Sequence, residues 1–466
     1  MKLFTRPKCF TDAIALNITL HRLLGIRIFE YPHGQPRPIL SLIYLLLLYA
    51  IHCGAFNLQD EYYADMTLLK LETFLYKILM TINTCSVLIK LILGWWYTKS
   101  FEVCYKKISE IDETLRQIGL VINYDIIYFV TIGVMITGLI FTIITSALVS
   151  IHLHNRVNLY TSIYMIVAYT YALFVNGIVI FDFYILVKYL QMRFELVNQF
   201  LYEHSGVSST KKRKLGFFEM QDYANIMNCE QRKRLSTKML SRWRRQTQPQ
   251  INISVLEKSS TVKSQIQTQF QKELQNQSQR HNPVMTKCEK RKHLLQTIKQ
   301  VHLELCKMSK TICTILGVQA AFDVAASIMF LTGMFYNLYN RYVVQQDKFV
   351  KTLTEQTAVS VILCTLTVVK IIFLSRICKK ASDEGNKTIE IIYGIYGCEA
   401  DIDMRCEIQQ FGIQILQSPI TFSAFGLSLG NNVISLGLRT VTTYLVIMIQ
   451  VSNSLESNKA IKLANI

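Results

Sequence analysis

The chain has 466 residues, 51% of them hydrophobic, and its 50 Lys and Arg against 32 Asp and Glu give a net charge of +18. Long uncharged runs alternate with polar segments, a pattern typical of a membrane protein with several spans rather than a soluble domain. No glycine-rich phosphate loop, HExxH zinc motif or nucleophile elbow occurs in it. We therefore expect no enzyme activity, no cofactor and no metal site.

Seven apolar runs are each about long enough to cross a bilayer as a helix. In chain order they are residues 39–56, 78–96, 126–151, 160–181, 311–339, 357–375 and 433–451. Four of them contain one charged residue each, namely Lys90, Asp323, Lys370 and Arg439. Asp323 is the single carboxylate among them, and it is expected either to contact a ligand or to pair with a neighbouring helix. The sequence predicts an all-α membrane protein with seven transmembrane helices.

Charge predicts the orientation. Residues 204–300, between the fourth and fifth spans, hold 20 Lys and Arg against 6 Asp and Glu. Basic residues also flank these two spans closely, namely Lys188, Arg193, Lys299, Lys307 and Lys310. The segment between the first two spans is instead acidic, with Asp60, Glu61 and Asp65. Because cytoplasmic segments are enriched in Lys and Arg, we place the N-terminus inside and the C-terminus outside.

The expected organisation follows the spans. It comprises a cytoplasmic lead-in (1–38), spans one to four with a cytoplasmic extension of the fourth (39–203), a basic cytoplasmic loop (204–292), spans five and six with a cytoplasmic extension of the fifth (293–376), a cytoplasmic anchor helix and turn (377–432), the last helix (433–452) and an extracellular tail (453–466).

The basic loop is rich in Ser, Gln, Lys and Arg and poor in residues that build a core. Such a composition predicts a disordered, solvated connector. A second interpretation is that its basic clusters contact anionic lipid of the inner leaflet. Nucleic-acid binding is not expected, because no binding module is recognisable.

Seven helices invite comparison with G-protein-coupled receptors. Those receptors run in the opposite orientation, which would place the basic loop outside. The third span is followed by IHLHNRVNLY, which lacks their acidic-Arg-Tyr triad, and no proline falls within any span. The sequence argues against that class.

The last sixty residues carry a specific resemblance. A helix with Phe411 and Gln414 precedes Phe422-Ser-Ala-Phe-Gly426, then Asn431, then Thr443-Tyr444 with Gln450-Val451. This arrangement resembles the C-terminal signature of the insect gustatory receptors. Phe425 stands where that family has Cys, Val451 where it has Phe, and Arg439 where a small residue is usual.

The resemblance implies a homotetrameric, tastant-gated, non-selective cation channel in the plasma membrane of sensory neurons. Its last helix would line a central pore, and its tastant would be a sugar or a bitter compound. Assembly with related receptors is a variant of this expectation. The alternatives are a metabotropic seven-helix receptor, and an accessory channel subunit or transporter without a tastant of its own.

The last span supports a pore role from its own residues. At about 100° per residue, Ser435, Arg439, Thr443, Val446 and Ile447 lie within about 60° of Gln450. A polar stripe on a membrane helix faces either water or its own bundle. We expect Ser435, Arg439, Thr443, Val446, Ile447, Gln450 and Val451 to line the pore, and Tyr444 to pack between helices.

The resemblance also implies a ligand pocket in the outer half of the second to sixth spans. Its candidate residues, chosen for depth and hydrogen-bonding capacity, are Thr81, Asn83, Tyr164, Tyr171, Asp323, Asn337 and Ser360.

Overall fold

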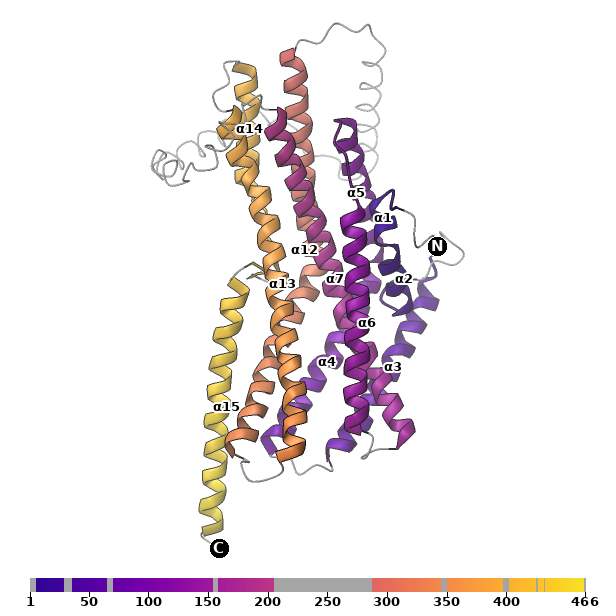
Figure 1. Cartoon of the computed structure of the whole chain (residues 1–466), viewed down its shortest axis with the longest axis vertical. Coiled ribbons are helices and arrows are strands. Elements are labelled where there is room, and N and C mark those ends of the chain that lie inside the picture. The colour runs from indigo at the N-terminus through magenta and orange to yellow at the C-terminus, as the bar shows by residue number, and fades with distance from the viewer. Residues whose placement is uncertain are drawn as a thin grey trace, which may run out of the picture. The chain divides into compact units, whose positions relative to one another are not determined.

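The computed structural model describes residues 6–28, 36–64, 70–153, 158–204, 287–344, 350–396, 402–424, 426–430 and 432–464 (Figure 1). Its contacts divide the chain into two compact units, residues 1–202 with 297–466, and residues 203–296. The account below concerns the first unit. The basic loop predicted at 204–292 falls almost wholly outside the described residues.

The described elements are nearly all helices. They are α1 (Phe10–Ala13), α2 (Ala15–Leu23), α3 (Pro38–Ala64), α4 (Lys70–Trp96), α5 (Thr98–Gln117), α6 (Asp125–Leu153), α7 (Leu159–His204), α12 (Lys287–Tyr339) with a π-helical continuation (Asn340–Val344), α13 (Val350–Tyr396), α14 (Ile402–Gln417), α15 (Asn432–Ala464), and the strands β1 (Ser423–Ala424) and β2 (Leu427–Ser428).

Within the described ranges, seven helices are long and apolar enough to cross a membrane: α3, α4, α6, α7, α12, α13 and α15. This confirms the seven predicted helices. Their outward surfaces are apolar as well, since Ile39 on α3 and Phe129 on α6 are 75% and 68% exposed. Large exposed apolar faces of this kind suit hydrocarbon and not water. The chain is therefore a multi-pass membrane protein.

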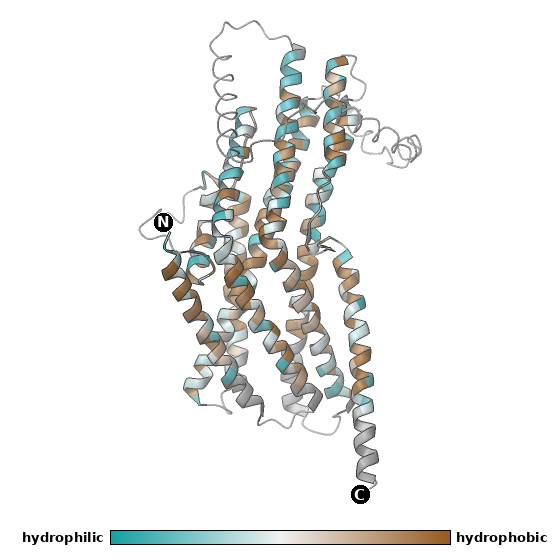
Figure 2. Ribbon diagram, turned by 180° about the vertical axis from the view of Figure 1, so that it is seen from behind, coloured by the Kyte–Doolittle hydropathy of each residue, from teal (hydrophilic) through white to brown (hydrophobic). Residues whose placement is uncertain are grey.

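Three helices continue well beyond their apolar runs. α7, α12 and α13 extend as amphipathic helices at the end of the unit where α14 lies (Figure 1). Figure 2 shows that this end is richer in hydrophilic residues than the middle of the bundle. Even so, Leu305 and Phe411 are fully buried there. Burial of one face against the neighbouring helices stabilises these extensions.

The structure departs from the sequence expectation at two places. β1 and β2 form a two-stranded antiparallel ribbon in the turn before α15. Gly426 has φ of 78° in this tight turn, a left-handed conformation that glycine adopts without strain. α5 is an amphipathic helix between the second and third spans. Its sequence contains no long apolar run that would predict it.

Candidate functional site

α15 packs on its own bundle with one narrow face. A Cβ added to Gly437 would lie 3.6 Å from Ile328 of α12, an ordinary van der Waals distance, so α15 faces α12 at this position. Near the other end, Tyr336 Oη of α12 donates to Ser452 Oγ at 3.0 Å. Over residues 432–454 of α15, where burial is described, the buried residues are Val433, Gly437, Val441 and Ser452, which recur at helical spacing.

The residues predicted to line a pore lie on the rest of the helix surface. All are exposed in the single chain: Ser435, Arg439, Thr443, Val446, Ile447, Gln450 and Val451. In Figure 1 α15 lies beside α12 and α13 at the edge of the bundle. The polar stripe therefore does not attach the helix to its own bundle, which was the alternative reading of the pattern.

The polar side chains of the stripe differ in whether they have a hydrogen-bond partner. Ser435 Oγ donates to Asn432 O, and Thr443 Oγ1 donates to Arg439 O at 2.9 Å, so these hydroxyls are satisfied within the helix. Gln450 and Arg439 make no side-chain hydrogen bond or ion pair with the described part of the chain. An unsatisfied amide or guanidinium is costly in hydrocarbon. These two side chains require water or another subunit.

Arg439 has no carboxylate partner among the described residues of its own chain. Glu407 of α14, one acid that could have paired with it, accepts instead from Lys299 Nζ at 2.8 Å. Tyr444 is 56% exposed, so a neighbour that packs on it would have to come from outside the subunit.

The C-terminal motif has structural roles where it is described. Phe411 packs against His302 of α12, with ring centroids 5.5 Å apart, and Gln414 Nε2 donates to Lys299 O at 3.2 Å. Phe422 is 3% exposed and meets Phe183 of α7 edge-on. Gly426 forms the hairpin turn. Asn431 lies outside the described residues.

The predicted pocket residues do not converge on one cavity. Tyr164 Oη donates to Ile51 O at 2.6 Å, and Tyr171 Oη donates to Leu24 O at 3.2 Å. Thr81 Oγ1 donates to its own helix. Asn337 is half-buried near the C-terminal end of α12, and the side chain of Ser360 lies outside the described residues.

Asp323 and Asn83 are brought into one buried network. Lys90 Nζ of α4 and Lys370 Nζ of α13 donate to opposite oxygens of Asp323, each at 2.7 Å. Lys90 also donates to Asn176 Oδ1 of α7 at 2.6 Å, and Asn176 donates to Asn83 Oδ1 at 3.1 Å. The network joins α4, α7, α12 and α13 in the membrane-spanning part. It pairs one carboxylate with two ammonium groups.

An apolar groove lies between α12 and α13. Its volume is 270 Å³, and its lining residues are Phe335, Leu338, Val361, Cys364, Thr365, Val368 and Val369. The hydroxyl of Thr365 donates to Val361 O, so it offers little to a polar ligand. None of the predicted pocket residues lines this groove.

A second buried carboxylate was missed from the sequence. Asp182 of α7 accepts from Arg27 Nη2 at 3.1 Å and from Asn17, and His21 Nε2 lies 2.8 Å from it. Burial lowers the pKa of His21 even though Asp182 opposes the shift. The apolar run 160–181 ends immediately before this carboxylate, and no sequence pattern connects it with the buried polar residues of α2.

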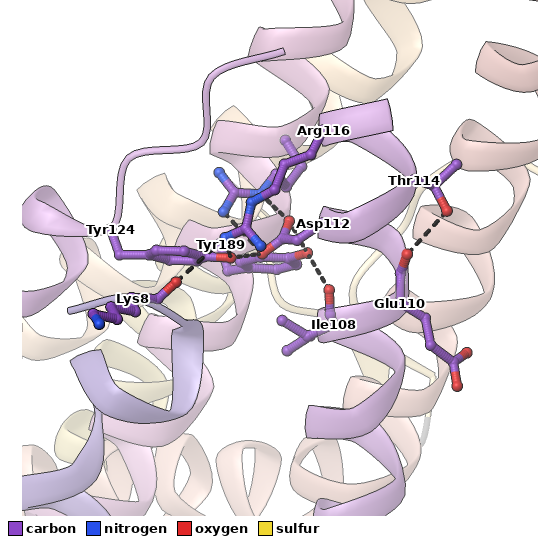
Figure 3. A network of polar contacts seen from close by, with 9 residues as sticks. Lys8, Ile108, Glu110, Asp112, Thr114, Arg116, Tyr124 and Tyr189 are labelled. Atoms are coloured by element: carbon purple, nitrogen blue, oxygen red, sulfur yellow. Dashed lines mark hydrogen bonds and ion pairs between the residues drawn. The ribbon is translucent and has the colours of Figure 1, made fainter. Parts of the chain in front are cut away.

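A third carboxylate anchors α5 (Figure 3). Asp112 is 1% exposed and binds Arg193 of α7 in a bidentate pair, with distances of 2.6 and 3.1 Å. Tyr189 and Tyr124 donate to the same carboxylate at 2.9 and 2.6 Å. Burial raises the pKa of Tyr124, so its phenol remains a donor. Both oxygens of Asp112 are hydrogen-bonded, so we interpret its role as holding α5 to α7.

Comparison with known proteins gives three results. Residues 260–453 match a family model described as 7tm chemosensory receptor, which confirms the predicted resemblance at that level; such receptors are not enzymes. No curated protein matches the chain. Among solved structures, an insect olfactory receptor from Machilis hrabei in complex with eugenol is similar, with 11% identity over 94% of this chain and 97% of that one. The TM-score is 0.44, too low to transfer any property from that receptor.

Proposed function

Residues 260–453 carry the match to the chemosensory receptors, and on that premise we propose that the chain is a subunit of a ligand-gated ion channel. The channel is a homotetramer in the plasma membrane of sensory neurons. Four copies of α15 surround a central, non-selective cation pore. A small-molecule tastant, either a sugar or a bitter compound, opens it.

The surface of α15 carries this proposal. Gln450 and Arg439 find no partner in the described part of their own chain, although the helix is long and apolar enough to cross a membrane. In hydrocarbon such groups are rare and usually face a polar cavity. A pore built by several copies of α15 supplies water to Gln450 and a neighbouring subunit to Arg439.

The orientation rests on the distribution of charge. Exposed Lys310, Lys379 and Lys380 lie at the end of the bundle that carries α14, where the basic loop also joins α7 to α12. This end is cytoplasmic by the positive-inside rule. The C-terminus of α15 then lies outside.

The ligand region of this proposal is the apolar groove between α12 and α13. It suits an aliphatic or aromatic part of a ligand. Both α12 and α13 also contact α15. Ligand contacts on these helices therefore have a direct route to the pore.

Excised membrane patches without GTP provide the test. We expect a tastant panel to evoke cation current there, because receptor and pore are one molecule. A response that disappears entirely when G proteins are blocked would contradict the channel and support the metabotropic alternative.

A further inference from the structure

Unpaired cations gather where α7 and α13 run side by side. Arg376 and Lys380 are exposed on α13. Lys188 of α7 is half-buried and lies near Lys380. Lys188 donates to Gln191 of its own helix. None of the three cations forms an ion pair with a described carboxylate. Like charges are thus held together at this place without a close ion pair to a described carboxylate, and Glu195 of α7 attracts Lys188 from beyond ion-pair distance.

An aromatic pair borders these cations on the side nearer the middle of the span. The rings of Tyr184 and Phe373 are stacked with centroids 4.6 Å apart. Tyr184 precedes Lys188 by one helical turn, and Phe373 precedes Arg376 by about one turn. Phe373 is 51% exposed, so the pair is open to the surroundings of the bundle.

Aliphatic residues continue the same stripe of α13. Ile362, Leu366 and Val369 are 46%, 39% and 54% exposed. With Phe373, Arg376 and Lys380 they recur every three or four residues, which places them on one face of the helix. Along this face the order is aliphatic, then aromatic, then cationic. The same order describes a phospholipid from acyl chain through the interfacial region to an anionic headgroup.

We propose that α7 and α13 form a binding site for an anionic phospholipid. The headgroup phosphate binds Lys188, Arg376 and Lys380. The interfacial region lies on Phe373, and an acyl chain lies along the aliphatic part of the stripe. A face exposed only to water would not need the aliphatic residues, and one exposed only to acyl chains would not need the cations. Exposed Glu195 and Asp383 nearby reduce the local charge without pairing these cations.

This site rests on the proposed function only in assigning the lipid to the inner leaflet. Binding itself is independent of channel activity. It can be measured on purified full-length protein as the concentration of phosphatidylserine that gives half-maximal protection against heat. A failure of the lipid site and a failure of the channel are therefore distinguishable.

The test compares two triple variants. K188Q/R376Q/K380Q removes the proposed headgroup contacts, and K99Q/K106Q/K310Q removes an equal charge from exposed, unpaired lysines on α5 and α12. Each cation near an anionic lipid surface contributes roughly fivefold to binding. We expect the first variant to need at least ~10-fold more phosphatidylserine than the wild type, and the second to be nearly unchanged. Phosphatidylcholine and inorganic phosphate should not protect either protein.

Equal weakening in both triple variants would overturn the proposal, because it would indicate non-specific charge attraction. Equal protection by inorganic phosphate would overturn it as well. If the first variant does not fold, native mass spectrometry of the wild type decides. Retention of phosphatidylserine in preference to phosphatidylcholine is expected, and its absence would contradict the site. The charge-conserving variant K188R/K380R should retain binding.

Discussion

Buried carboxylates in the interior of the bundle have partners within the subunit, whereas Gln450 and Arg439 on the outer face of α15 do not have them among the described residues. Inside, Asp323 is bound by two lysines, and Asp112 has an arginine and two tyrosines. On α15, Gln450 and Arg439 have no partner in the described chain. The interior groups are explained by the subunit alone, whereas those of α15 are not.

The difference indicates which polar residues can be read as structural. A buried charge in a membrane helix is tolerated when neighbouring helices supply counter-charges. A polar stripe that the subunit leaves exposed implies water or a second copy. The predictions below test the two sides of this comparison.

Breaking the interior network should have the largest effect. Asp323→Asn leaves buried Lys90 and half-buried Lys370 close together without a carboxylate. Loss of one partner of a buried pair costs about 3–5 kcal/mol. We expect low surface expression and a lowered unfolding temperature in detergent. Asp383→Asn, which changes an exposed acid of α13, is the matched control and should behave as wild type.

The same variant also separates two roles of Asp323. If Asp323→Asn is expressed and stable but loses its response to ligand, the carboxylate contacts the ligand rather than holding the helices. Replacing the charges together, as in Lys90→Met with Asp323→Leu, should recover part of the stability that the single substitution loses.

Arg439→Gln should have an intermediate effect. We propose that the guanidinium pairs with an acid of a neighbouring subunit, and a hydrogen bond to a charged group contributes about 1.5–3 kcal/mol. The tetramer should be weakened or its gating impaired, while the reversal potential of open channels stays the same. Increased cation conductance with normal assembly would place Arg439 in the conduction path instead.

The fold was predictable from the sequence to the extent that it depends on hydropathy. Long apolar runs identify the seven helices because every backbone group in lipid must be hydrogen-bonded internally. The extensions of α7 and α12 follow from their helical periodicity. α5 has no apolar run, and the β1–β2 ribbon depends on a single turn, so neither was predicted.

The candidate site was predictable only in part. The stripe on α15 is a property of one helix, and its geometry is fixed by sequence spacing. A ligand pocket depends on which helices meet, which spacing along one helix does not reveal. Tyr164 and Tyr171 have suitable chemistry, but their hydroxyls bind the backbone carbonyls of Ile51 and Leu24.

The smallest effect is expected where α15 is attached to its own bundle. Tyr336→Phe removes the hydrogen bond to Ser452, which contributes about 1 kcal/mol. A double-mutant cycle with Ser452→Ala should show this coupling in thermal unfolding. Tyr342→Phe, at an exposed tyrosine of the same segment, should leave stability unchanged.

Accessibility of α15 in the working channel tests the central claim most directly. Gln450→Cys and Thr443→Cys would each be treated with a charged, thiol-specific reagent while ligand holds the channel open, with Val441→Cys on the buried face as control. We predict that modification blocks current at Gln450→Cys and Thr443→Cys and leaves Val441→Cys and the wild type unaffected. If Gln450→Cys reacts no faster than Val441→Cys, or reacts without any change in current, α15 does not line the pore.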